Sequence, residues 1–455
     1  MTNMDNQAKE PGSSKVPLHR RIAENLSQQV SSGKLKQGER LPSERLIARQ
    51  FHASRATVRT ALQHLEQAGL IARRERRSAV VSIRRDITPF LRLACSNPRL
   101  MRLFGRLSEM QLLPPRCQLQ LADLPTIGTL GHLATQPALR ADVLICDLEY
   151  VKCFRGQQDY FSPVPRRQVA DIPILPVLQD MLLEDDNFTA VPLGISPQVI
   201  FFNQAIMNEA QLAPPADNWQ WNDLREMALQ LTHAGRYGFQ FRPSFNHLSA
   251  LMAGWGGQLY QADGRIAARS AEVFEPVIRY IYDLLHIHKV TPLLAKGETL
   301  NLFAARRCAL ALDGFEQYGL YHEKLGENLR IGPLPRSIGG FQIPSGYALV
   351  VLGKPSESQP VLDLIRMLLS VGTQRMLTQV SAALPVRVDL QNGQTLRDHD
   401  LSSEFAETFL KELRHCKPVN LPSLAEHKHA VEELFLELWL GLDNVESLCH
   451  RFREL

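Results

Sequence analysis

Hydrophobic positions near the N-terminus follow helical spacing in two neighbouring runs, and this pattern predicts two short helices separated by a tight turn. The apolar positions are Leu46, Ile47 and Phe51 in the first run, and Val58, Ala61, Leu62 and Leu65 in the second. Ser43 and Ser54 precede the two runs and are placed to act as N-caps, whose side chains accept a hydrogen bond from the first turn. Gly69 follows the second run and suits the left-handed conformation that ends many helices.

The polar positions of the second helix have a different role, because its apolar side chains are committed to the core. Arg55, Thr57 and Arg59 lie off that apolar stripe and near the helix N-terminus. A helix-turn-helix presents side chains from this position to the DNA major groove. A plain helical hairpin with a solvated basic face has the same local pattern, so the flanking sequence has to decide between the two interpretations.

The flanking sequence favours DNA binding. PLHRRIAENLSQQVSSGKLKQGER is typical of a first helix that stops at Gly33, and ARRERRSAVVSI is a basic, strand-like segment after the second helix. With LPSER, SRATVR and GLI in this order, residues 15–83 resemble the winged helix-turn-helix of the GntR repressor family. The resemblance implies that contacts to DNA phosphates and bases come from five residues: Arg45, Ser54, Arg55, Thr57 and Arg59.

The expected wing departs from the family's pattern. The family usually has glycine at the wing tip, where the missing side chain lets the backbone approach the minor groove. This chain has Glu75, Arg76 and Arg77 at that position. We therefore expect Arg76 and Arg77 to bind DNA phosphates more than to read bases.

Charge is distributed unevenly along the chain. Residues 15–85 contain 16 Lys and Arg residues against 5 Asp and Glu residues, a net charge of +11. The remaining sequence contains 35 basic and 42 acidic residues, a net charge of −7, so the overall charge of +4 conceals a basic head and an acidic body. Only the head has the positive charge that attracts nucleic acid, and its DNA binding is expected to weaken as salt concentration rises.

The remaining composition favours a cytoplasmic protein without a metal or membrane site. No apolar run in the 455 residues is long enough to span a membrane, and the polar N-terminus lacks the layout of a secretory signal. The seven cysteines are scattered and odd in number, which is typical of reduced thiols. The pairs His286 with His288 and His427 with His429 lack partner ligands at metal-binding spacing, so we expect no metal and no cofactor.

Beyond the head, short apolar strands alternate with helices. Strands are predicted at residues 90–96, 117–122 and 141–147, and helices at residues 97–111 and 126–134. This alternation predicts a parallel, doubly wound α/β sheet. Ligands bind such sheets beyond the carboxyl ends of the strands, which here lie at Ser96 and Asp147.

Several segments of the body occur in the order found in a second family. They are VPLGISPQVIFFNQAIMNEAQLAPP, NWQWNDLREMALQL, MAGWGGQLYQADGRI, FAARRCALALDGFEQYGL, IGPLPRSIGGFQIPSGYALVV and SVGTQRMLTQVSAALPVRVDL. Together they resemble bacterial extracellular solute-binding proteins of the maltose-binding type over residues 88–455. The resemblance implies a two-lobed, type II periplasmic-binding-protein-like α/β domain, whose chain crosses between the lobes near residues 193–201, 310–315 and 345–350.

The resemblance also implies a small-molecule effector, a sugar or oligosaccharide, in the cleft between the lobes. Sugars bind to an aromatic face and to planar polar groups, and the candidate residues divide in the same way. The aromatic candidates are Trp255 in the GWGG turn, Phe315 and Tyr318. The polar candidates, at predicted strand ends, at crossings or one helix before the turn, are Asn246, His247, Asp147 and Ser196. Each of these residues has a plain alternative role in core packing.

Two other bodies are compatible with a GntR-type head. One is an aminotransferase-like body with pyridoxal phosphate. The sequence has no Schiff-base lysine in a Ser/Thr-rich segment, and no GxSxG elbow, P-loop or glycine-rich dinucleotide fingerprint. The other is the two-lobed sensor of lactose-repressor relatives. This sensor differs in strand order, so the sequence alone leaves it as an alternative.

The sequence therefore predicts four parts. They are a flexible tail (1–14), a winged helix-turn-helix domain of the α+β class (15–84), a linker (85–89) and a solute-binding-like α/β effector domain (90–455). We expect a transcriptional regulator, not an enzyme, that binds a palindromic double-stranded DNA operator as a homodimer and responds allosterically to its effector. The identity of the effector and the direction of its effect on DNA binding stay open at this stage.

Overall fold

The computed structural model divides the chain into two compact units, Met1–Phe90 and Leu91–Leu455, called the head and the body below. The residues that the structure describes are 18–31, 35, 39–67, 71–72, 79–81, 91–95, 97–114, 117–121, 141–154, 161–260, 271–293, 299–352, 356–380, 383–397, 401–420 and 425–454. The expected tail (1–14), the expected linker (85–89), the helix predicted at 126–134 and the two helix stops predicted at Gly33 and Gly69 lie outside these residues.

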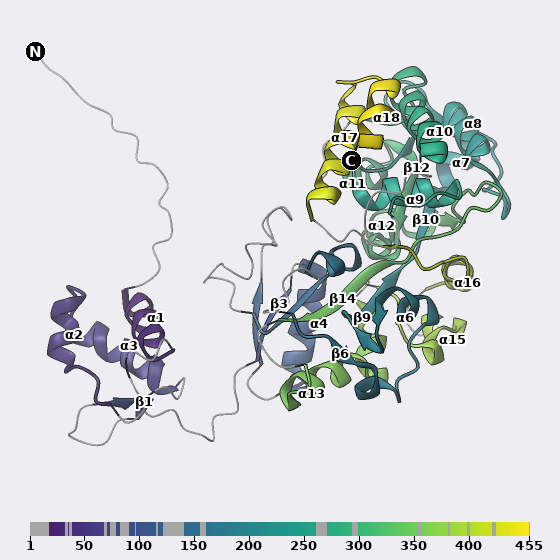
Figure 1. Ribbon diagram of the computed structural model, residues 1–455. Coiled ribbons are helices and arrows are strands. Elements are labelled where there is room, and N and C mark those ends of the chain that lie inside the picture. Colours follow the sequence, from purple (N-terminus) through teal and green to yellow (C-terminus); the bar gives the residue numbers. More distant parts are fainter. Residues whose placement is uncertain are drawn as a thin grey trace, which may run out of the picture. The chain divides into compact units, whose positions relative to one another are not determined.

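Within its described residues, the head combines three helices with a short two-stranded sheet. Its elements are α1 (Leu18–Ser31), α2 (Glu44–Gln50), α3 (Arg55–Gln67), β1 (Ile71–Ala72) and β2 (Val80–Val81) (Figure 1). The strands β1 and β2 pair antiparallel. The helices enclose one small core: Ile22, Leu26, Leu35, Leu41, Ile47, Val58, Ala61, Leu62, Leu65, Ile71 and Ala79. The predicted pair of helices, α2 and α3, is confirmed.

Local hydrogen bonds explain where α2 and α3 begin. The hydroxyl of Ser43 accepts from the backbone N–H of Leu46 at 3.3 Å, and the hydroxyl of Ser54 accepts from the N–H of Thr57 at 3.1 Å. Both N-cap predictions are confirmed. The prediction that Leu46 is buried is wrong, since this side chain is 55% exposed. Successive helix residues point about 100° apart, so Ile47 faces the core of this seven-residue helix while Leu46 faces solvent.

One lobe of the body is built on a five-stranded sheet with the order β4-β3-β5-β14-β9, and we call it the five-stranded lobe. Its strands are β3 (Leu91–Cys95), β4 (Cys117–Leu121), β5 (Val143–Asp147), β9 (Val191–Ser196) and β14 (Ser345–Val351). The strand β3 is parallel to β4 and β5, whereas β14 is antiparallel to β5 and β9. The three early strands are therefore confirmed, but the sheet is mixed and not wholly parallel as predicted.

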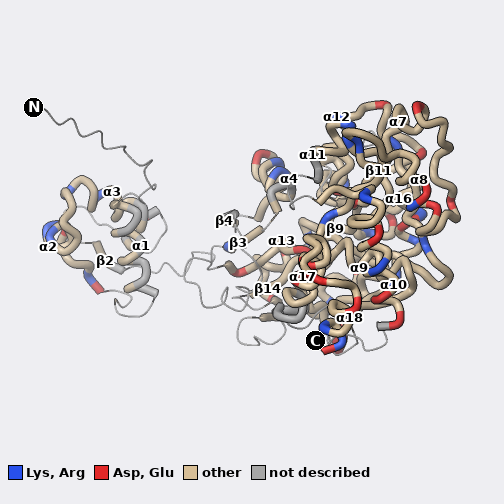
Figure 2. The backbone as a smooth tube through the Cα atoms, turned by 90° about the horizontal axis from the view of Figure 1, so that it is seen from above, with Lys and Arg blue, Asp and Glu red and all other residues tan. Residues whose placement is uncertain are grey.

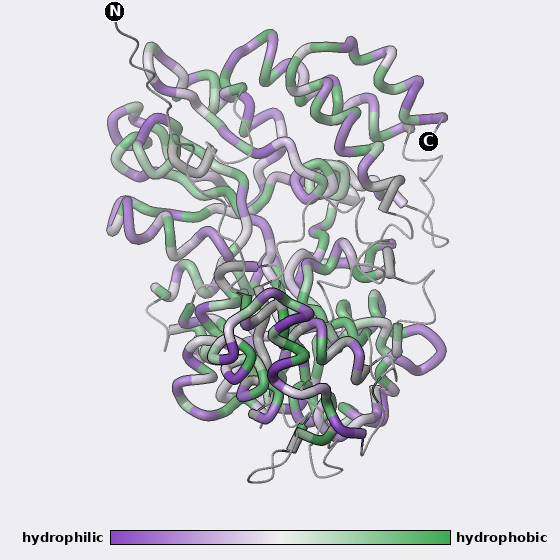
Figure 3. The backbone as a smooth tube through the Cα atoms, turned by 90° about the vertical axis from the view of Figure 1, so that its left-hand side faces the viewer, coloured by the Kyte–Doolittle hydropathy of each residue, from purple (hydrophilic) through white to green (hydrophobic). Residues whose placement is uncertain are grey.

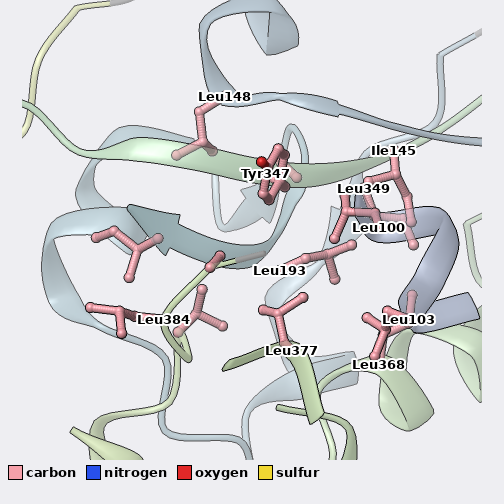
Figure 4. Close-up of a cluster of buried hydrophobic side chains, with 14 of the residues drawn as sticks. Leu100, Leu103, Ile145, Leu148, Leu193, Tyr347, Leu349, Leu368, Leu377 and Leu384 are labelled. Carbon is pink, nitrogen blue, oxygen red and sulfur yellow. The ribbon is translucent and has the colours of Figure 1, made fainter. Parts of the chain in front are cut away.

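The core of this lobe lies between the sheet and three helices, α4 (Pro98–Glu109), α13 (Gln359–Leu368) and α14 (Val371–Gln379). Figure 4 shows the side chains that meet there, among them Leu100, Leu103, Ile145, Leu193, Leu349, Leu368 and Leu377. Residues 143–146 of β5 are all buried. A strand covered on both faces has a continuous apolar run, which explains the sequence VLIC at this position.

The other lobe contains a four-stranded sheet with the order β11-β12-β10-β13, and we call it the four-stranded lobe. Its strands are β10 (Gln198–Asn203), β11 (Tyr237–Gln240), β12 (Cys308–Gly314) and β13 (Leu329–Gly332). Along β10 the buried side chains alternate: Ile200 and Phe202 belong to one core, and Val199 and Phe201 to the other. Side chains of a strand point to opposite faces in turn, so this sheet is buried on both faces.

Helices cover both faces of the four-stranded sheet. One face packs against α8 (Trp221–Leu231), α9 (Phe245–Gly254), α10 (Ala271–Tyr282), α17 (Ala425–Leu440) and α18 (Val445–Glu454). The opposite face packs against α11 (Thr299–Ala304), α12 (Tyr318–Leu325) and α16 (Ser403–Arg414). Polar and apolar positions alternate along the helices of the body (Figure 3), as expected when one side of each helix faces the core.

Shorter elements complete the body. They are η2 (Leu148–Phe154), β6 (Val164–Pro165), η3 (Arg166–Val169), α6 (Pro176–Leu182), β7 (Leu183–Glu184), β8 (Asn187–Phe188), α7 (Gln204–Glu209), η5 (Asp283–Ile287), η6 (Phe315–Gln317), η7 (Gly326–Asn328), η8 (Val388–Leu390) and α15 (Gly393–Arg397). The strands β6, β8 and β7 form a small separate sheet in that order.

In the part of the body that the structure describes, three passages of chain connect the two lobes. The first is the step from β9 to β10 at residues 196–198, and the second is residues 333–344 between β13 and β14. The third runs from α15 through α16 to α17, which packs beside α9.

The first passage falls inside the crossing predicted at 193–201, and the second ends at the start of the one predicted at 345–350. The crossing predicted at 310–315 is not observed, since β12 ends at Gly314 and the chain returns through α12 to β13 of the same sheet. The apolar pattern of a strand does not show whether the chain that follows it returns to the same sheet or crosses to the other lobe. The sequence therefore could not distinguish the two cases.

Candidate functional site

The start of α2 and the exposed face of α3 form the candidate DNA-binding surface of the head. Arg45, Ser54, Arg55 and Arg59 are exposed and Thr57 is half-buried, while the apolar face of α3 packs into the core of the head. Figure 2 marks Lys and Arg positions on α2 in blue. Exposed arginines near a helix N-terminus suit contacts to phosphates and to base edges.

An ion pair holds α2 and α3 together at this surface. Arg59 Nε donates to Glu44 Oε2 at 3.0 Å, and the Arg59 side chain is 64% exposed. Exposed ion pairs contribute little to stability, so a DNA phosphate can replace Glu44 as the partner of Arg59 with little loss of stability. Five of the seven predicted DNA-binding residues thus lie on α2 or at the start of α3. Arg76 and Arg77 lie outside the described residues.

The body contains a cleft of about 490 Å³, within the range of small-molecule sites. Its wall is contributed by both lobes and by the passages between them. The polar residues of the wall are Asn97, Asp147, Glu149, Ser196, Gln198, Arg242, Ser244, Asn246, His247, Ser249, Gln258, Glu316, Gln317, Ser345, Asn420 and Glu432. A wall of this composition can form many hydrogen bonds with one solute.

Four of the seven predicted effector-binding residues line this cleft. Asp147 stands at the end of β5, Ser196 at the end of β9, and Asn246 and His247 in the first turn of α9. The structure therefore brings together the polar candidates, which sequence had placed at strand ends, at crossings and on the helix before the GWGG turn. Their contact with a solute stays a prediction.

The three aromatic candidates do not line the cleft: Phe315 and Tyr318 are buried, and Trp255 is half-buried. Trp255 is the C-cap of α9, and its ring lies 5.8 Å from that of Tyr280 against the core of the four-stranded lobe. Phe315 is fully buried and stacks on Tyr318 at 6.1 Å between ring centroids. The aromatic residues of the described cleft wall are instead Tyr150, Phe245, Tyr260 and Tyr347.

A buried ion pair that sequence reasoning missed stands in the wall of the cleft. Arg242 Nη2 donates to Asp313 Oδ1 at 2.6 Å, and the Tyr321 hydroxyl donates to Asp313 Oδ2 at 2.5 Å. Burial alone raises the pKa of Asp313, but Arg242 and His247 outweigh it, so the pKa lies below its ordinary value. Asp313 is therefore a charged acceptor that holds Arg242 in place.

The same carboxylate helps to orient His247. His247 Nε2 lies 3.6 Å from Asp313 Oδ1, and the Ser244 hydroxyl lies 2.9 Å from His247 Nδ1. One ring nitrogen of His247 therefore faces the Ser244 hydroxyl and the other faces the Asp313 carboxylate. Two polar residues of the wall, Arg242 and His247, thus share one buried partner.

Three buried polar atoms of the wall have no hydrogen-bond partner in the part of the chain that the structure describes. They are Gln198 Oε1, Arg242 Nε and Ser249 Oγ. Leaving a buried polar atom unsatisfied costs about 1–3 kcal/mol, and native proteins rarely do so without a reason. These atoms are positions where a bound solute can complete the hydrogen bonding.

The passages also contribute polar contacts to the wall. The Ser196 hydroxyl donates to the Glu316 carboxylate, and the Ser345 hydroxyl donates to the main-chain oxygen of Ser196. Elsewhere in the wall, burial and the nearby Glu149 raise the pKa of Tyr150, so its hydroxyl stays a neutral donor. The wall therefore presents both donors and acceptors.

Within the described ranges, no group of three or more His, Cys, Asp or Glu side chains could hold a metal ion. Among the helices of those same ranges, none has the length and apolar character to cross a membrane. Burial raises the pKa of the Cys95 and Cys117 thiols to about 11, so both are protonated at neutral pH. The cleft offers hydrogen bonding and aromatic contact to a solute.

Two protein families match separate parts of this chain. Residues 18–81 match the bacterial regulatory proteins of the gntR family. Residues 135–375, more than half of the chain, match the bacterial extracellular solute-binding proteins. The two matches follow the division into head and body.

Curated relatives match over short stretches. The transcriptional repressor NagR of Bacillus subtilis is 44% identical over 69 residues, which are 15% of this chain and 28% of NagR. MngR of Escherichia coli, the repressor of a mannosyl-D-glycerate transport and metabolism system, is 40% identical over 55 residues, which are 12% of this chain and 23% of MngR. The chain thus spans about a quarter of the length of these relatives.

Solved structures match the body. Maltose-bound MalE3 of T. maritima has a TM-score of 0.67 at 16% identity, over 80% of this chain and 98% of that one. The substrate-binding protein Lmo0181 of Listeria monocytogenes, in complex with cycloalternan, has a TM-score of 0.66 at 14% identity, over 80% and 97%. At these identities the likeness shows the fold, which is that of the maltose-binding type and not of the lactose-repressor type. The chain belongs to the bacterial extracellular solute-binding protein family and carries a gntR-family helix-turn-helix domain as its head.

Proposed function

We propose that the protein is a transcriptional regulator that binds a two-fold symmetric DNA operator as a dimer and responds to a neutral, polyhydroxylated solute. The observation that carries the proposal is a polar cleft of about 490 Å³ in the same chain as a gntR-family head. The names of NagR and MngR describe repressors, and two of the structural neighbours were solved with maltose and cycloalternan. A sugar or oligosaccharide is therefore the solute that we favour.

The chemistry of the cleft supports a solute rich in hydroxyl groups. Each hydroxyl both donates and accepts, so it can donate to Gln198 Oε1 and accept from Arg242 Nε. Ser249 Oγ can take either role. The rings of Tyr150 and Tyr260 in the wall can cover the apolar face of a sugar ring. Asp313 already orients Arg242 before a solute binds, and this lowers the entropy cost of binding.

DNA binding follows from the head, which we expect to act in the cytoplasm where the operator lies. Dimers of helix-turn-helix proteins read half-sites about 34–36 Å apart, so a change in the spacing of two heads prevents simultaneous binding. Coupling between two sites is commonly about 1–3 kcal/mol, equivalent to about a 5- to 150-fold change in operator affinity.

The test begins with the full chain and a panel of maltose, D-glucose, D-mannitol and longer maltodextrins. A binding solute should raise the melting temperature and change operator affinity in a gel shift with promoter DNA from the protein's own gene. Ser249→Ala should weaken the thermal shift because it removes a hydroxyl from the wall. Ser108→Ala is the matched control, since Ser108 is exposed on α4.

Two results would contradict the proposal in different ways. If no carbohydrate in the panel raises the melting temperature, the solute class is wrong. If a binding sugar leaves operator affinity unchanged across a range of concentrations, the cleft does not control the head.

A further inference from the structure

All three passages between the lobes meet at one buried side chain, that of Gln342. This residue lies in the second passage, between β13 and β14, and is fully buried. Its Nε2 donates to the main-chain oxygen of Gln198 at 2.6 Å, in the first passage. The same atom donates to Glu412 Oε2 at 2.7 Å, on α16 in the third passage. A single amide group therefore joins the first two passages to α16, the helix through which the third passage runs.

The main chain of Gln342 is also hydrogen-bonded to the third passage. Its N–H donates to the oxygen of His415 at 2.9 Å, and its oxygen accepts from the N–H of Lys417 at 3.0 Å. Arg336, also in the second passage, donates to Glu412 Oε2 at 2.7 Å. We call the residues that these side chains connect the hinge network: Gln198, Arg336, Gln342 and Glu412.

The hinge network is incompletely satisfied in this arrangement of the lobes. Gln342 Oε1 and Glu412 Oε1 are buried and have no hydrogen-bond partner among the described residues. Buried acceptors without donors are unfavourable, and more so when the acceptor is charged. A second arrangement of the passages that supplies donors to these two atoms would therefore compete with the present one.

The network also reaches the solute site. Gln198 lines the cleft, and its side-chain oxygen is one of the three buried atoms of the wall without a partner. Its main-chain oxygen is the acceptor for Gln342 Nε2. A solute that binds the Gln198 side chain therefore contacts a member of the hinge network directly.

We propose that Gln342 is a positioning residue of the hinge. Its hydrogen bonds hold the three passages in one arrangement, and binding of a solute at Gln198 shifts the body to a second arrangement with a different angle between the lobes. The solute part rests on the proposed function, whereas the role of Gln342 in setting the angle does not. Experiments without a solute therefore test the hinge on its own.

The first test measures the distance between the lobes in the full chain without any solute. Spin labels are attached to non-native amino acids at Asn222 on α8 and Asp363 on α13, both exposed, so that the native cysteines stay unmodified. Gln342→Met removes the amide and keeps the length of the side chain. Pulsed electron paramagnetic resonance should show the population of a second distance rise about tenfold or more, as expected for loss of a hydrogen bond to a charged group.

Gln374→Met is the matched control. Gln374 is equally buried, and its Nε2 donates to the main-chain oxygens of Leu193 and Leu368, all within the five-stranded lobe. This variant should lose stability but keep the wild-type distance distribution. A purely structural role of Gln342 predicts the same outcome for both variants, so equal distributions would overturn the proposal.

A second variant covers the case in which Gln342→Met does not fold. Glu412→Gln preserves the shape of the side chain and removes its charge, so it should weaken the bonds from Gln342 and Arg336 and shift the distances in the same direction. A wild-type distribution in a folded Glu412→Gln protein would overturn the proposal. Maltose, or another sugar that binds in the thermal-shift panel, should shift the wild-type protein toward the second distance. Lack of any binding sugar would contradict the proposed function and leave the solute-free result standing.

Discussion

Replacing Asp313 with alanine removes a buried acceptor that Arg242, in the cleft wall, shares with Tyr321 behind it. Arg242 Nη2 and the Tyr321 hydroxyl both donate to this carboxylate, at 2.6 and 2.5 Å. In the alanine variant the Arg242 guanidinium loses its counter-charge and the Tyr321 hydroxyl loses its acceptor. Both the stability of the body and the position of Arg242 should therefore change.

The magnitude follows from how deeply the partners are buried. Removing one partner of a buried ion pair typically destabilises a protein by about 3–5 kcal/mol. The Arg242 side chain is 20% exposed and lies near Glu316, so part of its charge stays compensated. Tyr321 is fully buried and has no such compensation. We therefore expect a loss at the low end of this range, about 3 kcal/mol.

Urea denaturation monitored by tryptophan fluorescence measures the change in unfolding free energy. The two proteins can be compared if their unfolding free energies fall with urea concentration at the same slope. A changed slope indicates that the substitution has altered the unfolded or the folded state. Glu209→Ala is the control, because Glu209 pairs with Arg236 from an exposed position and should contribute at most about 1 kcal/mol. If Asp313→Ala loses no more stability than Glu209→Ala, the buried pair does not have the energetic role inferred from its geometry.

Further predictions concern the core, the head and the acid range. Leu103→Ala should lower the unfolding free energy by about 2–5 kcal/mol in the same assay, because this side chain is buried between α4 and the five-stranded sheet; a loss below that of Glu209→Ala would contradict this packing. Arg55→Ala should weaken operator binding in a gel shift by about 1–3 kcal/mol if Arg55 reads a base, whereas the exposed Arg106 on α4 can be changed without effect. The pKa of Asp313 is below its ordinary value of 3.8 in the folded protein, so its stabilisation is complete above that pH and is lost as the pH falls through the folded pKa. The difference in unfolding free energy between wild type and Asp313→Asn should therefore be constant from neutral pH to about pH 5 and shrink below about pH 4; a constant difference down to the acid limit would contradict the assigned charge.

Sequence located the polar half of the cleft because strand ends have a fixed place in this architecture. Asp147 ends β5 and Ser196 ends β9, and both ends face the cleft between the lobes. The aromatic half could not be located in this way. Trp255 follows a helix, and the direction of its ring depends on Tyr280, which packs against it from α10. Spacing along the chain does not contain that information.

The buried polar contacts of Arg242, Asp313 and Gln342 could not be predicted for the same physical reason. Arg242 and Asp313 are 71 positions apart, and Gln342 bonds to residues 144 and 70 positions away. Each contact forms only when the passages come together in the folded body. In the head, by contrast, the decisive contacts are local, such as the cap from Ser54 to Thr57, and sequence predicted them.

The connectivity of the lobes has a consequence for signalling between two chains. The strand β3 follows the head in the sequence and belongs to the five-stranded lobe, whereas the last helices, α17 and α18, belong to the four-stranded lobe. The chain therefore passes from the head into the five-stranded lobe, and the proposed closing motion would move the four-stranded lobe relative to that point of attachment. If the proposed dimer forms through the five-stranded lobes, closure would leave the two points where the heads are attached at a constant separation. If it forms through the four-stranded lobes, the same motion would change the separation of these attachment points. In the proposed mechanism, the contact surface of the dimer therefore decides whether solute binding can alter operator affinity.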